Sequence, residues 1–247
     1  MIIKDVPLFP LDLVLFPQMV LPLRIFEARY RQMITECIKD DKPFGVVLLQ
    51  SGDSVMEGRS HAETPRPFKV GTLARITEVT HLEDGGMMIT TVGTGRFHLR
   101  EYRTDRPYMT GDVELWPDEP EELEGGVLEE TVSRVTLVFE QYLRILMELA
   151  GKRIQSLDIP TDPEVLSFLV PNWLYISAQD KQLLLEAPGL RIRLENELHI
   201  LENETAFFEK IKARAAQPDN ENNPGDKGEV LWKETNPYDL RNRFSAN

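Results

Sequence analysis

The sequence predicts an α+β fold in which a β-rich first part is followed by a helical second part. The first part consists of short apolar runs separated by turn residues, a pattern typical of strands. The second part repeats apolar residues at the spacing of amphipathic helices. The charge shifts with the pattern: residues 1–115 carry 14 Lys and Arg against 16 Asp and Glu, and residues 116–247 carry 14 against 25. We therefore predict a β-rich subdomain over 1–117, a helical subdomain over 118–216, and a linker with a C-terminal tail over 217–247.

Three apolar runs near the N-terminus predict strands. Leu11–Phe16 and Met19–Ile25 are short and bounded by prolines, and Phe44–Gly52 has the composition of a buried strand. Proline cannot donate a ladder hydrogen bond, so we expect it at strand starts, edges or bulges. The next stretch, Gln50–Lys69, has two glycines, two prolines and little periodicity, and it predicts a loop.

The clearest β signal lies between Val70 and Pro117. Asp84-Gly85-Gly86 predicts a hairpin turn, because glycine accepts the positive φ that tight turns require. Gly93-Thr94-Gly95 predicts a bulge or kink in the returning strand. Strict alternation follows, which predicts a buried face with Phe97, Leu99 and Tyr102. The predicted solvated face carries Arg96, His98, Arg100, Glu101 and Arg103.

One amphipathic helix, over Phe26–Asp41, is predicted inside the β-rich part, packed on the sheet. Its apolar positions are Phe26, Tyr30, Met33, Ile34, Cys37 and Ile38.

The second part predicts several helices with recognisable starts. Residues 126–152 and 190–216 form the two longest helical patterns. Asp162 before a proline and Ser177 before Ala178-Gln179-Asp180 are capping residues that begin two shorter helices. The tail regains apolar anchors, and it either packs on its own body or docks to a partner. These anchors are Leu231, Trp232, Tyr238, Leu240 and Phe244.

Cysteine content, apolar runs and net charge exclude several classes of protein. The single cysteine, Cys37, excludes an internal disulfide and a cysteine-based zinc site, and we expect it on the buried face of a helix. No apolar run reaches the length of a membrane span, and the N-terminus lacks a signal-peptide pattern, so we expect a cytoplasmic protein with no membrane contact. The net charge of −13 argues against broad nucleic-acid binding.

Catalytic and metal-binding patterns are not found in the sequence. It has no phosphate loop, no GxSxG elbow and no HExxH motif, and its four histidines lack metal-ligand spacing. We therefore expect no metal, no cofactor and no enzymatic activity. One weak alternative is an unrecognised hydrolase that uses His61 with Ser51, Ser54 or Ser60, although a nucleophilic serine needs a positioned base.

A recognition surface is the remaining interpretation. Strands broken by proline leave backbone donors and acceptors unpaired along an edge, and such an edge can accept an extended peptide as a further strand.

The motifs also indicate a family. Three motifs follow one another in the chain: P-L-F-P-L…V-L-F-P…L-P-L-R-I-F-E at Pro7–Glu27, V-G-T-x-A-x-I at Val70–Ile76 and G-x-x-R-F at Gly93–Phe97. Their order strongly resembles that in the N-terminal domain of ATP-dependent Lon proteases. The helical stretch Ser167–Glu204 is similar to the same family, so the resemblance covers about residues 5–210. Full-length Lon continues into an ATPase and a protease module, and this sequence contains neither set of motifs.

The resemblance implies a fold and a role. It implies a PUA-like bent sheet or pseudo-barrel with one packed helix, followed by a helical subdomain. Pro7, Pro10, Pro17 and Pro22 would then end and redirect short strands. The implied partners are unfolded or extended protein segments and protease components, and the implied role is an adaptor or regulator of proteolysis. The implied peptide-binding residues are Phe26, Arg29 and Tyr30.

An RNA-binding module is the main alternative, because PUA-like folds elsewhere bind RNA. Arg96, Arg100, Arg103 and Arg106 lie close together in sequence and predict a basic strip beside one hairpin. The oligomeric state stays open.

Overall fold

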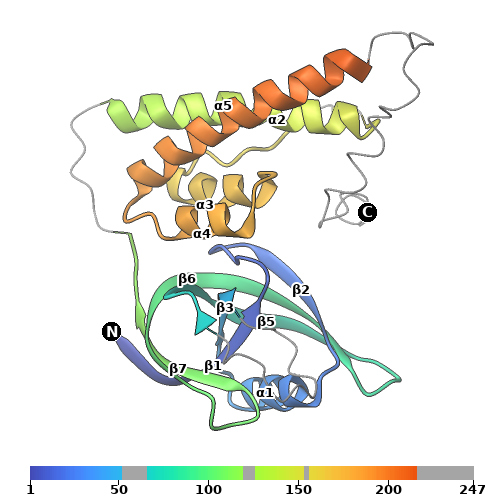
Figure 1. Cartoon of the computed structure of the whole chain (residues 1–247), viewed down its shortest axis with the longest axis vertical. Coiled ribbons are helices and arrows are strands. Elements are labelled where there is room, and N and C mark those ends of the chain that lie inside the picture. The colour runs from blue at the N-terminus through green and yellow to red at the C-terminus, as the bar shows by residue number, and fades with distance from the viewer. Residues whose placement is uncertain (52–65, 119–125, 153–155, 216–247) are drawn as a thin grey trace.

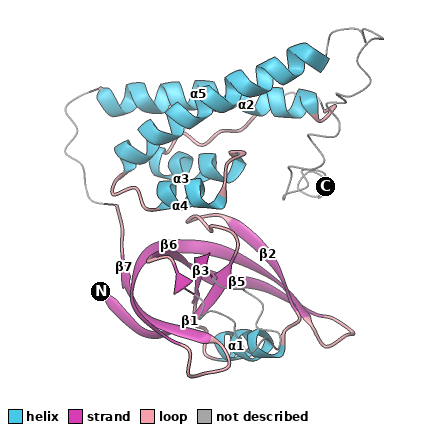
Figure 2. Cartoon of the chain, viewed as in Figure 1, coloured by secondary structure: helices cyan, strands magenta, loops and turns pink. Residues whose placement is uncertain are grey.

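The computed structural model of the chain describes residues 1–51, 66–118, 126–152 and 156–215. Within these residues, seven strands and the short helix α1 form a β-rich part, and four further helices stack against one end of it (Figures 1 and 2). The α+β class is thereby confirmed. In order, the elements are β1 (Ile2–Leu11), β2 (Val20–Ile25), α1 (Ala28–Lys39), β3 (Phe44–Ser51), β4 (Arg66–Pro67), β5 (Val70–His81), β6 (Met87–Arg103), β7 (Met109–Leu115), α2 (Val127–Leu149), α3 (Pro163–Trp173), α4 (Ala178–Leu185) and α5 (Leu190–Ala215).

Five of the strands close into a small barrel. The strand order β1-β7-β6-β5-β3 returns to β1 through a parallel β1–β3 pairing, whereas the other pairings are antiparallel. The long strand β6 curves around the barrel with the help of bulges. The predicted bulge at Gly93-Thr94-Gly95 is confirmed, because Gly93 pairs with Ala74 and Gly95 with Leu73, which leaves Thr94 as the extra residue.

A three-stranded arm extends from the barrel. The first half of β6, Met87–Val92, pairs with β2 on one side and with the outer half of β5, Arg75–His81, on the other. The predicted hairpin turn joins β5 to β6 at the tip: Gly85 has φ 78° and the backbone N–H of Gly86 donates to Asp84 Oδ1 at 2.9 Å. The arm projects beyond the barrel (Figure 1).

Three of the four prolines lie inside strands and do not end them, contrary to what the resemblance implied, although Pro22 lies in an edge strand as expected. Pro7 lies where β1 pairs only with β7, and Pro10 lies where β1 pairs only with β3. Pro22 lies in β2, whose only described neighbour is β6. A strand with one neighbour needs hydrogen bonds on one side only, so a missing donor is tolerated there. Pro17 alone lies in a turn between strands.

The predicted strand at Leu11–Phe16 is wrong. β1 ends at Leu11, and the following residues cross over the barrel end as a loop before β2 begins at Val20. Its apolar residues are buried for a different reason: Leu15 packs into the core beneath α1, and Phe16 packs into the helical core. A buried loop and a buried strand have the same composition, so periodicity did not separate them.

Helix α1 covers one face of the arm and the adjoining part of the barrel. It starts later than predicted, at Ala28, and it buries Tyr30, Met33, Ile34 and Cys37 against the sheet.

The helical part follows the sequence prediction closely. Asp162 accepts the backbone N–H of Val165 at 2.9 Å, and Ser177 Oγ accepts that of Asp180 at 3.1 Å, so both predicted caps begin their helices. The long helices α2 and α5 pack side by side above α3 and α4 (Figure 1). None of the described helices has the length and apolar composition needed to cross a membrane. Of the predicted loop Gln50–Lys69, residues 52–65 lie outside the described residues, whereas its two ends contain the last residues of β3 and the short strand β4. The predicted tail over 217–247 also lies outside them.

Candidate functional site

The three residues predicted to bind peptide lie at the start of α1, but they differ in accessibility. Phe26 lies between β2 and α1 and is 64% exposed. Arg29 forms an ion pair with Glu27 at 2.8 Å, and its guanidinium lies 4.4 Å from the centre of the Tyr30 ring. Tyr30 itself is buried and stacks on Phe9 at 4.2 Å. Phe26 therefore exposes an aromatic surface to solvent, whereas Tyr30 belongs to the core and contacts the Arg29 guanidinium with the face of its ring.

Strand β2 presents its residues on two faces of the arm. Leu21, Leu23 and Ile25 turn toward the core under α1. Val20, Pro22 and Arg24 alternate with them and are exposed.

The exposed face of the arm continues from β2 onto β6. Arg24 pairs with Met88, which is 38% exposed, and Val20, 60% exposed, pairs with Val92. We call Val20, Pro22, Arg24, Met88 and Phe26 the β2 surface. It combines exposed apolar side chains with one strand edge that has no described neighbour.

The predicted RNA-binding strip does not form a basic surface. Arg96 is buried, with 3% of its surface exposed, so the prediction that it faces solvent is wrong. The other three arginines are on the surface, and each has an acidic partner: Arg100 with Glu114, Arg103 with Asp112 and Arg106 with Asp5. Arg103 holds the pKa of Asp112 at about 2, chiefly through its hydrogen bonds to that carboxylate. Paired charges of this kind offer little net field to a phosphate backbone.

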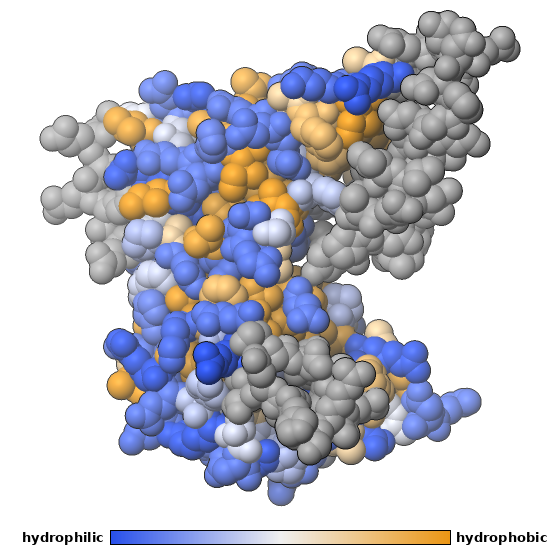
Figure 3. All heavy atoms as spheres, viewed as in Figure 1, coloured by the Kyte–Doolittle hydropathy of each residue, from blue (hydrophilic) through white to orange (hydrophobic). Residues whose placement is uncertain are grey.

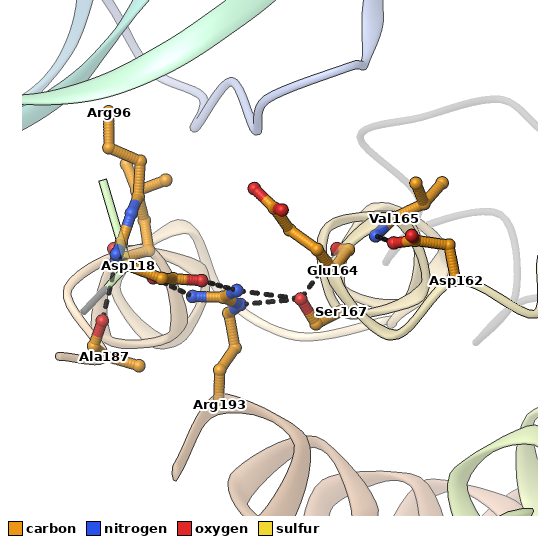
Figure 4. Close-up of polar contacts among 9 residues, drawn as sticks. Arg96, Asp118, Asp162, Glu164, Val165, Ser167, Ala187 and Arg193 are labelled. Carbon is orange, nitrogen blue, oxygen red and sulfur yellow. Dashed lines mark hydrogen bonds and ion pairs between the residues drawn. The ribbon is translucent and has the colours of Figure 1, made fainter. Parts of the chain in front are cut away.

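Arg96 joins the β-rich part to the helical part (Figure 4). Its Nη1 donates to the carbonyl oxygens of Leu185 and Ala187 at 2.7 and 2.6 Å, where α4 ends. A cation is favourable at this position because the unpaired carbonyls of a helix C-terminus carry partial negative charge. Burial lowers the pKa of Arg96 to about 10, and the carboxylate of Asp118 opposes that shift. Arg96 therefore remains charged at neutral pH.

Asp118 lies between two buried arginines. It contacts Arg96 and also accepts Nη1 and Nη2 of Arg193 at 3.1 and 2.6 Å. Arg193 is fully buried, and its Nε donates to Ser167 Oγ at 3.0 Å. Figure 4 shows the carboxylate of Asp118 between the two guanidinium groups. We call Arg96, Asp118 and Arg193 the junction cluster.

Apolar residues surround the junction cluster. Phe16 from the loop before β2 and Val70 from β5 are buried within the core of the helical part. Gln182 of α4 donates to the carbonyl oxygen of Val70 at 2.9 Å. Figure 3 shows apolar residues gathered where the two parts meet in this view. The helical part is therefore docked on the barrel through both ionic and apolar contacts.

The structure provides no support for a metal site among the described residues. No group of three His, Cys, Asp or Glu side chains there has a geometry suited to a metal ion. His98 stacks on Trp116 at 4.1 Å, and burial lowers its pKa. The proposed hydrolase residues cannot be placed, because Ser54, Ser60 and His61 lie outside the described residues, as does the side chain of Ser51.

Comparison with known proteins decides the family. The family model described as the ATP-dependent protease La (LON) substrate-binding domain matches residues 5–203. The chain belongs to the Lon substrate-binding domain family. The N-terminal domain of Lon is non-catalytic, and the chain has the fold of a substrate-recognition module.

Curated relatives are whole Lon proteases. Lon protease 1 of Hydrogenovibrio crunogenus is 27% identical over 217 residues, and Lon protease of Brevibacillus choshinensis is 26% identical over 210 residues. Each alignment covers 83% of this chain, but the chain spans only about a quarter of the length of these relatives, 25% and 26%.

Solved structures support the same family. The Lon N-terminal domain protein from Xanthomonas campestris aligns with a TM-score of 0.58 and 26% identity, over 80% of this chain and 98% of that one. The N-terminal domain of Mycobacterium avium complex Lon protease aligns with a TM-score of 0.55 and 20% identity, over 82% and 98% of the two chains. The latter likeness concerns the fold alone.

Sequence reasoning missed the junction residues. Asp118 lies in an acidic stretch, DEPEELEGG, that has the composition of a solvated linker. Arg193 lies in a helix whose polar face mixes Glu with Lys and Arg, so nothing in the local pattern distinguishes it. One signal in the sequence pointed to Arg96. The G-x-x-R-F motif of the family specifies an arginine at this position, whereas strand alternation alone would accept any polar residue there.

Proposed function

We propose that this chain binds protein substrates as extended segments through the surface around Phe26, and that it does so without catalysing their hydrolysis. Family membership supports the recognition of protein substrates. The observation that carries the proposal is Phe26, an aromatic side chain that is 64% exposed directly beside an edge strand. Large exposed aromatic residues are the usual anchors of protein interfaces, because they bury much apolar area at low entropic cost.

Arg29 and Tyr30 belong to the proposed site in different roles. Arg29 is partly buried, forms an ion pair with Glu27 and holds its guanidinium over the Tyr30 ring, so it contributes a fixed positive charge at the start of α1. Tyr30 cannot touch a bound segment from its core position, and it acts by fixing the orientation of Arg29. Partners of this surface are unfolded or extended segments with apolar residues.

A second part of the proposal concerns proteolysis. We propose that the chain acts as an adaptor or regulator of a Lon-type protease in the cytoplasm. The location is supported by Cys37, which is free and buried, as expected of a protein that needs no oxidising compartment. Adding the chain to a purified Lon-type protease should change the initial rate at which an unfolded substrate is degraded. An unchanged rate, at chain concentrations above those that bind the substrate, contradicts the adaptor role.

The test of substrate recognition compares two exposed phenylalanines. Phe26→Ser should weaken binding to extended peptides on an array by about tenfold, the cost of losing one aromatic anchor. Phe207→Ser is the matched control, because Phe207 is also an exposed phenylalanine, 48% exposed on α5. Its binding should equal that of the wild-type chain. Equal weakening by both substitutions, or by neither, contradicts a site at Phe26.

A further inference from the structure

Several strand edges have no described neighbour, and β2 differs from two of the others, the outer half of β5 and the start of β1. The outer half of β5, from Ile76 to His81, carries a register shift and exposed polar side chains. The start of β1 carries a register shift between Ile3 and Val6, with Lys4 and Asp5 within it. Bulges and charges of this kind protect a strand edge from pairing. β2 carries one charge, Arg24, and one proline, Pro22, but it keeps an unbroken register with β6 from Val20 to Ile25.

The pairing of β2 determines which backbone groups face outward. Gly93 donates its N–H to the carbonyl oxygen of Met19 at 2.9 Å, so Met19 faces β6. In an antiparallel pair, alternate residues face the partner, which places Leu21 and Leu23 toward β6 as well. Val20, Pro22 and Arg24 therefore direct their backbone groups to the open side. The N–H groups of Val20 and Arg24 and three carbonyl groups are available there, and Pro22 contributes an acceptor without a donor.

The side chains beside this edge indicate the chemistry of its occupant. Val20, Pro22 and Met88 form an exposed apolar strip on the solvent face of the arm. A strand added at the edge would place every second side chain beside that strip. We propose that the open edge of β2 receives an extended, apolar segment of a protein substrate as an added antiparallel strand. This inference rests on the proposed function, and it specifies the site and the form in which the substrate binds.

Pro22 selects against a second copy of the chain as the occupant. A pair of β2 strands from two copies would contain two Pro22 residues and would lack two donors in any register, whereas the register centred on Pro22 would also place the two rings opposite one another. A substrate strand of ordinary sequence meets one proline, and it keeps the hydrogen bonds to Val20 and Arg24. The edge therefore accepts a foreign segment while self-pairing is disfavoured, which is the use of edge prolines in natural sheets.

The test uses the full chain with a permanently unfolded, carboxymethylated model protein as the probe, and binding is measured by fluorescence anisotropy. Pro22→Thr restores the central donor, so it should tighten binding by about two- to tenfold, the contribution of one hydrogen bond. Val20→Asp places a charge on the apolar strip and should weaken binding at least tenfold. Leu137→Asp is the control, because Leu137 is an apolar residue 67% exposed on α2; its binding should stay at the wild-type level.

Sedimentation velocity completes the test, because Pro22→Thr should also shift the chain toward dimers. Far-UV circular dichroism confirms that each variant is folded. Wild-type binding that neither β2 variant alters overturns the edge site and leaves the proposed function standing. A wild-type chain that does not bind the unfolded probe overturns the proposed function itself. Dimerisation of Pro22→Thr with unchanged probe binding also overturns the proposal, because the edge would then pair only with itself.

Discussion

Replacing Asp118 by asparagine should destabilise the whole chain, because it removes the negative charge shared by two buried arginines. Arg96 and Arg193 are 3% and 0% exposed, and the Asp118 side chain is 13% exposed. Asparagine keeps the shape and one acceptor oxygen but removes the negative charge that directly contacts both guanidinium groups.

The size of the effect follows from burial. Removing one partner of a buried ion pair costs about 3–5 kcal/mol, since the remaining charge stays desolvated and unpaired. The asparagine side chain of the variant would retain part of the hydrogen bonding, so we expect a loss near the lower limit, about 3 kcal/mol. Domains unfold with only about 5–15 kcal/mol, so this is a large fraction of the total.

Urea unfolding measures the loss, followed both by far-UV circular dichroism and by tryptophan fluorescence. Trp116 reports on the junction, because its ring lies 4.3 Å from the Arg96 guanidinium. Glu114→Gln is the control: Glu114 pairs with Arg100 on the surface, with side chains 32% and 58% exposed, and such pairs contribute about 0–1 kcal/mol. A loss under about 1 kcal/mol for Asp118→Asn, or one equal to that of the control, would refute the reasoning.

Two further predictions concern burial and backbone packing. Glu197 is fully buried with neither carboxylate oxygen hydrogen-bonded within the described chain, and burial raises its pKa well above the usual value although Arg193 opposes the shift. The carboxyl group loses its proton at a lower pH in the unfolded chain than in the folded one, so wild-type stability should fall as the pH rises above about 4. Urea titrations at several pH values should show a smaller fall for Glu197→Gln, which should be more stable than the wild type by about 1–3 kcal/mol at pH 8. The same dependence of unfolding free energy on pH in both chains would contradict this. A Cβ at Gly93 would lie 2.3 Å from the carbonyl oxygen of Phe16, so Gly93→Ala should lower stability by about 1–3 kcal/mol in thermal unfolding. Gly95→Ala is the control and should not lower it, because a Cβ there would have no atom within 4 Å. A similar melting temperature for the two variants would count against this packing.

Local patterns were sufficient where one short segment determines the structure. The hairpin turn at Gly85, the bulge at Thr94 and the caps at Asp162 and Ser177 were predicted from a few neighbouring residues, because each depends on backbone conformation or a nearby side-chain acceptor. The order of the Lon-like motifs indicated the family, which the matched residues 5–203 confirm.

The same patterns failed where a residue's environment comes from distant segments. Strand alternation placed Arg96 in solvent, but a helix almost a hundred residues later covers it and supplies its carbonyl acceptors. In α5 the adjacent residues Phe207 and Phe208 differ in the same way, because the first is 48% exposed and the second is buried. Tyr30 and Phe26 both fit the apolar face of one helix, and the helix begins after Phe26.

The sequence alone determined the α+β class, the hairpin turn, the starts of α3 and α4 and the Lon-like family, because turn chemistry, capping and apolar period act within a few residues. Tertiary structure decided which arginines are buried, which aromatic residue is exposed and which strand edge stays open. These properties depend on what packs against a residue, and the packing partners of Arg96, Phe26 and β2 come from parts of the chain that no local pattern connects.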